Sequence, residues 1–243
     1  MNSDPAQVSS LSGPGSTAVK QSSEQSSEQA RAESTRVETV YQHILLQIVS
    51  GTLAAGGEIK STQLARAFGL SRTPVVQALQ RLAADGLVSL ELNKRAVVRP
   101  GAENWLVELH ELREWLEPPA AARAALRVTD EDLAALREHA TLARPHSNAD
   151  WQAAAQRFDF ALHLTIADRA GNFALRETIR KIWTFKRISY LAEPQKPESL
   201  ERGYGEHLSL LGALERRDAE TARAAMLFHL RSAGTLRQSR TIV

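Results

Sequence analysis

Residues 61 to 82 read STQLARAFGLSRTPVVQALQRL, and this stretch predicts two short helices joined by a tight turn. Ser61 is a suitable N-cap for the first helix, and Leu64 and Phe68 lie on one apolar face at helical spacing. Gly69 follows them, and a residue without a Cβ readily adopts the positive φ that ends a helix. The first helix is therefore expected to end at Phe68.

The second helix is expected to begin after Ser71, whose side chain can cap it. Pro74 falls in its first turn, where a missing backbone N–H costs little. The buried face of this helix is apolar and consists of Val75, Ala78, Leu79 and Leu82. Its outer face is mainly polar and consists of Arg72, Thr73, Val76, Gln77 and Gln80. Short polar and cationic groups reach phosphates and base edges in a major groove. The pattern is typical of a DNA-reading helix-turn-helix, and an ordinary αα-hairpin is the alternative.

The sequence after the second helix favours the DNA-reading interpretation. Ala84-Asp85-Gly86 closes the helix, and residues 87–92 and 96–98 then alternate in the manner of two strands. Between them, Asn93-Lys94-Arg95 predicts a turn. A hairpin of this kind beside a helix-turn-helix is a wing, here with cations at its tip.

Residues 38–99 resemble the winged helix of the GntR family of bacterial transcription regulators. The resemblance rests on a G-x-L-x-x-G turn at residues 51–56, on the recognition-helix start Ser71-Arg72-Thr73-Pro74-Val75, and on the wing entry Asp85-Gly86-Leu87-Val88. The three motifs occur in the same order along the chain as in the family. The resemblance therefore implies that this part of the chain binds operator DNA.

Three family positions differ in this chain. Thr62-Gln63, Val76 and Ala96 stand where relatives usually carry an acidic-basic pair, an arginine and a glycine at the wing tip. Two customary DNA-contacting arginines are therefore absent. The operator sequence of better-known relatives cannot be carried over to this chain.

The expected binding partner of this surface is double-stranded operator DNA, and the expected contacts are Ser61, Thr62, Ser71, Arg72, Thr73, Gln77, Lys94 and Arg95. The charge distribution supports this placement. Residues 58–99 carry seven Lys and Arg against three Asp and Glu, whereas residues 100–243 carry twenty of each. A local cationic excess favours phosphate contact, and a solvated basic face is the alternative.

Composition limits the class of protein. The chain has 243 residues, of which 43% are hydrophobic, and it has no cysteine, which excludes disulfides and cysteine-based zinc sites. No segment approaches the roughly 20 apolar residues that a membrane span needs, and residues 1–20 lack the features of a signal peptide. We therefore expect a soluble cytoplasmic protein that does not bind a membrane.

Composition along the chain predicts four parts. Residues 1–36 are rich in Ser, Gln, Gly and Glu and poor in large apolar side chains, so a disordered tail is expected. Residues 37–99 form the winged helix-turn-helix, and Pro100-Gly101 opens a linker of residues 100–104. Residues 105–238 form the last domain.

The last domain is rich in Ala and Leu and has scarcely a strand signal. Its periodicity predicts helices over roughly 103–127, 130–143, 149–169, 172–191, 199–216 and 219–236. The predicted fold class is therefore mainly α, with an N-terminal winged helix-turn-helix carrying a small β wing, followed by an all-α antiparallel helical bundle.

Four side chains of the bundle are expected to point into its core. Asp159 and His163 are four residues apart, so they stack on one helix beside apolar neighbours, while His207 and His229 lie on the apolar faces of two other helices. Three imidazoles and a carboxylate together predict a divalent cation that takes their lone pairs. The donor set suits zinc, nickel, manganese or iron. The alternative is that each histidine is a hydrogen-bonded core residue.

The region from about Glu108 to Arg231 resembles the FCD domain that accompanies this winged helix in the FadR-type subfamily. The resemblance rests on the motifs D-x-x-x-H, E-H and H-L, here Asp159 to His163, Glu206-His207 and His229-Leu230. It implies a divalent metal at Asp159, His163, His207 and His229. The short bundle favours the six-helix VanR-type branch over the seven-helix one.

Arg113 is the candidate effector contact. It falls on the apolar side of the first bundle helix, in the R-x-x-x-E pair that it forms with Glu117. An inward guanidinium needs an anion, which is either a carboxylate effector held jointly with an open metal position or Glu117 itself. Both possibilities remain open at the level of sequence.

Two functions from different classes agree with these features. The first is a ligand-responsive repressor that binds an inverted-repeat operator as a homodimer and senses a small carboxylate through a metal-containing pocket. The second is a metal-dependent hydrolytic enzyme, because an open metal position could activate water. The sequence reveals no further acid near the four ligands, and an enzyme would leave the winged helix unexplained. We therefore expect a regulator and not an enzyme.

Overall fold

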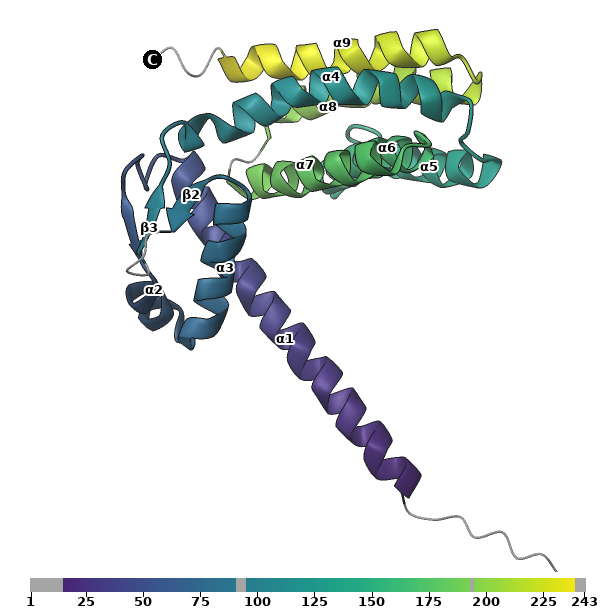
Figure 1. The fold of residues 1–243 in the computed structure, drawn as a ribbon. Helices are drawn as coiled ribbons and strands as arrows, with labels where there is room; N and C mark the ends of the chain where they lie inside the picture. The colour runs from purple at the N-terminus through teal and green to yellow at the C-terminus, as the bar shows by residue number, and fades with distance from the viewer. Residues whose placement is uncertain (1–14, 91–94, 193–194, 239–243) are drawn as a thin grey trace, which may run out of the picture. The chain divides into compact units, whose positions relative to one another are not determined.

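The computed structural model of the chain describes residues 15–90, 95–192 and 195–238. It divides into two compact units, one made of residues 1–45 with 58–97 and one made of residues 46–57 with 98–243. The described residues are mostly helical, with one small sheet (Figure 1). The predicted fold class is confirmed: a winged helix-turn-helix precedes an all-helical bundle.

The first unit contains the helix-turn-helix and its wing. Its elements are most of α1 (Gly15–Val49), β1 (Glu58–Lys60), α2 (Ser61–Phe68), α3 (Arg72–Ala84), β2 (Val88–Leu90) and most of β3 (Arg95–Val98). The strands form one sheet in the order β1-β3-β2, with Ile59 antiparallel and opposite Ala96. The sequence patterns did not predict β1, because three residues are too few to display an alternation.

The helix ends follow the local chemistry of the chain, with one exception. Gly69 has a φ of 62° and ends α2 after Phe68, as predicted. Ser71 occupies the N-cap position of α3 as predicted, but its side chain forms no capping hydrogen bond. Ser61, in contrast, is wrong as an N-cap, because α2 starts directly after β1 and Lys60 takes that position. The side chain of Ser61 is consequently buried.

A buried hydrogen bond fixes α3 against α1. The hydroxyl of Tyr41 donates to Oδ2 of Asp85 over 2.7 Å, at the residue that ends α3. Val40, Ile44 and Leu45 of α1 are fully buried. A buried hydroxyl or carboxyl group without a hydrogen-bond partner destabilises the folded state. This bond gives a partner to both groups at once.

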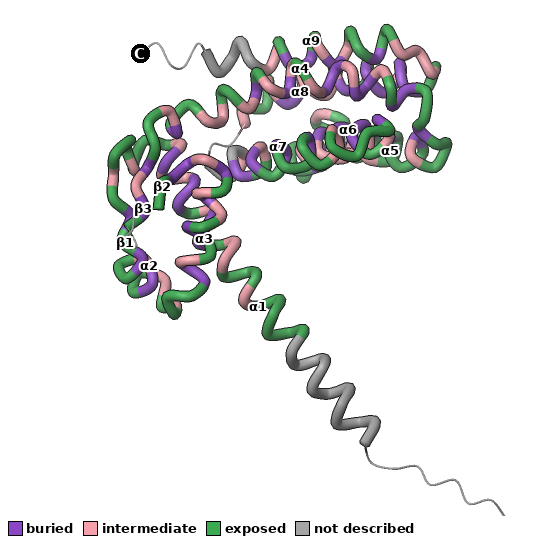
Figure 2. The backbone as a smooth tube through the Cα atoms, viewed as in Figure 1, coloured by how far each residue is buried: buried purple, intermediate pink, exposed green. Residues whose placement is uncertain are grey.

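Helix α1 begins earlier than the composition suggests. Residues 15–36, predicted as disordered, are helical, whereas residues 1–14 of the predicted tail lie outside the described residues. Ala, Gln, Glu and Ser tolerate a helix, and no proline follows Pro14 within the helix to break it. Nearly all side chains of residues 27–36 are exposed, so this part of the helix has little packing to stabilise it (Figure 2).

Deleting residues 1–36 is therefore expected to change the free energy of unfolding by less than about 0.5 kcal/mol, because this sequence has few large apolar residues and the side chains of residues 27–36 are nearly all exposed. Thermal and urea unfolding of the full and shortened chains measure this difference. Deletion of residues 1–45 is the control, since it also removes Val40, Tyr41, Ile44 and Leu45. A marked loss of stability in the shorter deletion would mean that the first 36 residues pack against the protein.

The described residues of the second unit form six long helices. They are α4 (Trp105–Ala125), α5 (Asp130–Leu142), α6 (Trp151–Arg169), α7 (Phe173–Ala192), α8 (Pro197–Glu215) and α9 (Ala219–Gln238), preceded by the 3₁₀ turn η1 (Ala102–Asn104). Each helix begins and ends within two residues of its predicted bounds. Helices α4, α8 and α9 lie along one side of the bundle and α5, α6 and α7 along the other (Figure 1).

The bundle core lies between these two layers. Helix α6 is central to it, because Phe158, Leu162 and Ile166 are almost completely buried and α6 contacts α4, α5, α7 and α8. Thr129 begins α5 with a reciprocal capping box to Asp132. No helix among the described residues is long and apolar enough to cross a membrane.

Candidate functional site

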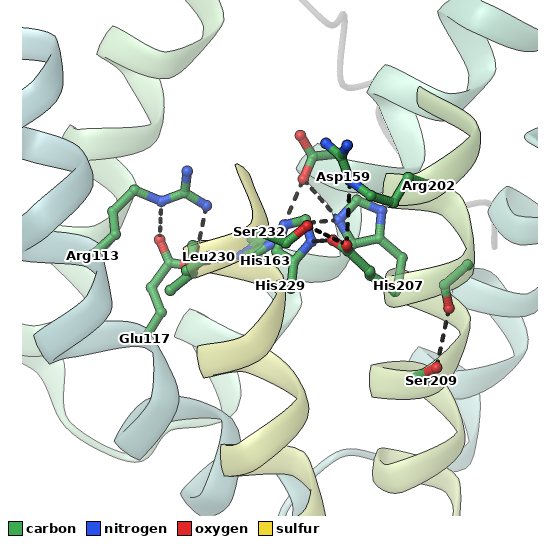
Figure 3. Close-up of polar contacts among 12 residues, drawn as sticks. Arg113, Glu117, Asp159, His163, Arg202, His207, Ser209, His229, Leu230 and Ser232 are labelled. Carbon is green, nitrogen blue, oxygen red and sulfur yellow. Dashed lines mark hydrogen bonds and ion pairs between the residues drawn. The ribbon is translucent and has the colours of Figure 1, made fainter. Parts of the chain in front are cut away.

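The four predicted ligands meet in the bundle core. Helix α6 supplies Asp159 and His163, one turn apart, while α8 supplies His207 and α9 supplies His229 (Figure 3). All four are buried, and one potential ligand atom from each lies within 4.8 Å of the others. The structure therefore confirms the prediction from helical spacing that these four side chains point into the core.

The facing atoms of the cluster are one carboxylate oxygen and three imidazole nitrogens. Oδ1 of Asp159 lies 3.3 Å from Nε2 of His163 and 3.1 Å from Nε2 of His207. Nε2 of His207 also lies 3.2 Å from Nε2 of His229. Thus every histidine turns the same ring nitrogen toward the others.

Two of these atoms have no hydrogen-bond partner among the described residues, namely Oδ1 of Asp159 and Nε2 of His163. The two nitrogens near Asp159 are close enough for ion pairs but do not form hydrogen bonds to Oδ1. Leaving a buried polar atom unsatisfied costs about 1–3 kcal/mol. A divalent cation would accept these lone pairs, so the residues fit a metal site better than a set of separately bonded core histidines.

Electrostatics favour the protonation states that a cation requires. Burial would raise the pKa of Asp159, but His207 and His163 beside it hold the pKa well below its usual range. Burial also lowers the pKa of His163, and with the nearby His207 it lowers that of His229 well below its usual range. A carboxylate and neutral imidazoles have free lone pairs and can therefore bind a divalent metal.

Two acids lie behind the cluster, and sequence reasoning missed them. Glu117 of α4 accepts a short hydrogen bond from Nδ1 of His163, and Glu206 of α8 lies 2.8 Å from Nδ1 of His229. The expectation that no further acid lies near the ligands was wrong, because helix packing brings these carboxylates to the outer nitrogens. Glu206 directly precedes His207, so the E-H motif was the available signal.

A third outer contact comes from α7. The hydroxyl of Tyr190 donates a short hydrogen bond to Oδ2 of Asp159, the oxygen that faces away from His163 and His207. This bond occupies one oxygen of the carboxylate and leaves Oδ1 for the cluster. The sequence did not predict this contact, because Tyr190 is not part of a recognisable polar motif in α7.

Glu117 is held by several donors in the core. Nε of Arg113 lies 2.5 Å and Nε1 of Trp183 lies 3.0 Å from Oε1 of Glu117. Burial would raise the pKa of Glu117, but the Arg113 guanidinium and His163 lower it to about 2. The carboxylate is therefore ionised and paired at neutral pH.

Arg113 occupies the second of its two predicted environments. Its side chain is only 3% exposed, it forms the internal salt bridge to Glu117, and its guanidinium stacks over the Trp183 ring at 4.4 Å. An effector that uses Arg113 would therefore meet a group already bonded to Glu117. Contact with an effector remains a prediction.

The predicted DNA contacts fall into three groups. Thr62, Ser71, Arg72, Thr73 and Gln77 are exposed on α2, α3 and their turn. Arg95 is also exposed at the start of β3, where it pairs with Glu58 over 3.0 Å. Ser61 is only 5% exposed, which contradicts its place on this surface, since α2 begins there and turns the side chain inward. Lys94 lies outside the described residues.

Comparison with known families gives two matches. The profile described as "Bacterial regulatory proteins, gntR family" matches residues 36–98, and the profile described as "FCD domain" matches residues 108–232. The second match contains all four residues of the buried cluster. The first contains the helix-turn-helix and its wing.

Individual proteins give a consistent picture. The chain is 31% identical to the HTH-type transcriptional regulator LutR of Bacillus subtilis (strain 168), over 75% of this chain and 92% of the relative. It is 29% identical to the Nta operon transcriptional regulator of Aminobacter aminovorans, over 75% of this chain and 85% of the relative. The solved structure of E. coli McbR/YncC shares the fold, with a TM-score of 0.61 at 24% identity over 85% of this chain and 98% of that one.

Proposed function

Because this chain belongs to the GntR family of bacterial transcription regulators and carries an FCD domain, we propose that it represses transcription in response to a small carboxylate bound at a metal in its bundle. It is a transcriptional regulator, and the alternative of a hydrolytic enzyme is wrong, since the matching families and relatives are regulators. The proposed DNA-binding form is a homodimer on an inverted-repeat operator.

One observation carries the metal-sensing part of the proposal. Four ligand-type atoms from three helices lie within 4.8 Å of one another in the core, and two of them, on Asp159 and His163, have no hydrogen-bond partner among the described residues. Zinc, nickel, manganese and iron all accept nitrogen and carboxylate donors. The bound ion would supply a Lewis-acidic position to an oxygen ligand.

The charge of the cluster favours an anionic effector. Asp159 is the one charged side chain among the four proposed ligands, so a divalent ion and these four ligands together would carry a net positive charge, which Glu117 and Glu206 offset only from the outer ring nitrogens. Four protein ligands also leave one or two positions in a five- or six-coordinate ion. A small carboxylate meets both conditions, because it contributes an oxygen donor and a compensating negative charge.

The homodimer follows from the size of the reader. One winged helix contacts only a few base pairs, and a two-fold protein axis matches an inverted repeat. Effector binding would then act by favouring one of two spacings of the DNA readers. This model requires only that the effector bind the two states with different affinity.

The direct experiment is a titration of the full chain into fluorescent DNA taken from upstream of its own gene. We expect specific, salt-dependent binding by a dimer, and a change in affinity when a divalent metal and a matching carboxylate are both added. Thermal-shift screening of small carboxylic acids selects the compound to use. Operator binding that no metal and carboxylate combination alters would contradict the sensing part of the proposal.

Substituting Arg72 by alanine is expected to weaken operator binding by about 1–3 kcal/mol, which is roughly 5- to 150-fold, if the guanidinium contacts a guanine edge. Arg72 is exposed at the first residue of α3, so its removal leaves the reader's core intact. The matched control is Arg223→Ala, an exposed arginine of α9 in the bundle. Equal operator affinity in wild type and Arg72→Ala would exclude Arg72 from base recognition.

A further inference from the structure

We propose that Glu206 is a positioning residue, which holds the imidazole of His229 with its proton on Nδ1 and the lone pair of Nε2 directed at the cluster. The inference rests on the proposed metal site. It concerns a residue outside the four ligands and assigns it a definite task, which is to select the tautomer of one ligand.

The tautomer follows from the contact between the two side chains. Oε2 of Glu206 lies 2.8 Å from Nδ1 of His229, and both side chains are less than a tenth exposed. A carboxylate can only accept, so Nδ1 must donate, and a neutral imidazole then carries no proton on Nε2. Nε2 is the atom that faces His207, at 3.2 Å. The bond to Glu206 therefore presents a lone pair to the centre of the cluster.

Glu206 is itself held in place by both helices that it joins. The hydroxyl of Ser232 on α9 donates to Oε1 of Glu206 over 2.5 Å, and Nε of Arg202, one turn earlier on α8, lies 3.5 Å from the same oxygen. Each carboxylate oxygen of Glu206 thus has its own partner. This arrangement fixes the direction in which Glu206 accepts from His229.

A second ligand histidine has the same kind of hydrogen bond to a carboxylate. Glu117 accepts from Nδ1 of His163, whose Nε2 likewise faces the centre. Two ligand histidines from different helices therefore have their outer nitrogen on a carboxylate, an arrangement that orients metal-binding imidazoles and raises their basicity. Glu206 is the better residue to test, because Glu117 also belongs to the core salt bridge with Arg113.

His207 provides an internal comparison. Because Nε2 of His229 carries no proton, the 3.2 Å contact between the two rings requires His207 to donate from its own Nε2. The metal-free protein should therefore contain His229 as the Nδ1–H tautomer and His207 as the Nε2–H tautomer. Loss of Glu206 should change the first assignment directly.

The test compares Glu206→Ala and the isosteric Glu206→Gln with wild type in the full chain. We expect Glu206→Ala to lower the affinity for Zn²⁺, measured by competition with a chromophoric chelator, by about 10- to 100-fold. Glu206→Gln retains an acceptor oxygen and should lose less. Two-bond ¹H–¹⁵N spectra of the metal-free proteins should record Nδ1–H for His229 in wild type and a shift toward Nε2–H in Glu206→Ala.

The matched control is Glu201→Gln. Glu201 lies on the same helix and also pairs with a histidine, His146, over 2.9 Å, but both side chains are exposed. Its substitution should leave Zn²⁺ affinity and the His229 tautomer unchanged. A metal-free Glu206→Ala protein in which His229 keeps wild-type Nδ1–H spectra and Zn²⁺ affinity overturns the inference. A wild type that binds no Zn²⁺ overturns the metal site itself, so the two failures are distinct.

Discussion

Replacing His207 by alanine is expected to abolish stoichiometric metal binding, whereas wild type should hold one divalent ion per protomer. His207 is the ligand whose Nε2 lies close to both Asp159 and His229, so its removal takes a donor from the middle of the set. Structural metal sites depend on their full ligand count. Elemental analysis of protein purified without an affinity tag or chelator, before and after loading, measures the difference.

The same substitution should remove the stabilisation that metal gives. A ligand present at a thousand times its Kd stabilises the folded state by about 4 kcal/mol, so added Zn²⁺ should raise the melting temperature of wild type and leave His207→Ala unchanged. The control is His146→Ala, because His146 is exposed and lies outside the cluster. Wild type that contains no metal and binds none when it is added would reduce the cluster to a polar core and remove the sensing mechanism.

Loss of the metal need not impair DNA binding. If the metal-free state is the one that binds the operator, His207→Ala should retain wild-type operator affinity but lose the response to metal and carboxylate. If the loaded state binds DNA, the variant should lose operator affinity as well. The titration into fluorescent operator DNA therefore also determines whether the metal-bound or the metal-free state binds DNA.

The parts of this protein that sequence predicted well depend on local chemistry. Helix α2 ends at Gly69 because a positive φ is needed there, and the six bundle helices lie within two residues of the bounds that their periodicity predicted. Asp159 and His163 were correctly predicted to lie on the buried face of α6, because residues four apart in a helix share a face. Such features are decided within one or two turns of the chain.

The parts that sequence missed depend on contacts between distant segments. Glu117 and Glu206 reach the ligands from α4 and α8, and no spacing rule relates them to His163 or His229. Strand β1 forms because β3 pairs with it, although its own three residues carry no pattern. Ser61 was misassigned since that strand immediately precedes it. Tertiary packing decides all of these, and one sequence does not record it.

The second large effect is expected in the core, where Arg113→Met should lower the free energy of unfolding by about 3–5 kcal/mol. The substitution leaves the Glu117 carboxylate buried without its cationic partner, and breaking one side of a buried ion pair has a cost of this size. The double variant Arg113→Met with Glu117→Gln should recover much of the loss, because it removes the unpaired charge and keeps one oxygen that can accept from either His163 or Trp183. Urea unfolding measures the free energy of unfolding of wild type, Arg113→Met and the double variant.

The pH dependence of wild type gives an independent measure of the pair. Burial opposes ionisation of Glu117, but Arg113 and His163 lower its pKa from 4.5 to about 2 in the folded protein. The folded state thus binds the proton less readily than the unfolded state. The resulting stability is present above about pH 4.5 and is lost as pH falls toward 2. Glu117→Gln lacks this titration, so its unfolding free energy should fall less over that range.

This experiment also separates the two roles considered for Arg113. If the guanidinium mainly serves Glu117, Arg113→Met destabilises the bundle, and the Glu117→Gln partner substitution restores it. If it mainly serves a carboxylate effector, Arg113→Met should cost less than about 1 kcal/mol of stability and instead remove the effector response. Because Arg113 is 3% exposed and lies 2.5 Å from Glu117, we expect the first result. An effector would then act on Arg113 only by competing with Glu117, which in turn holds His163.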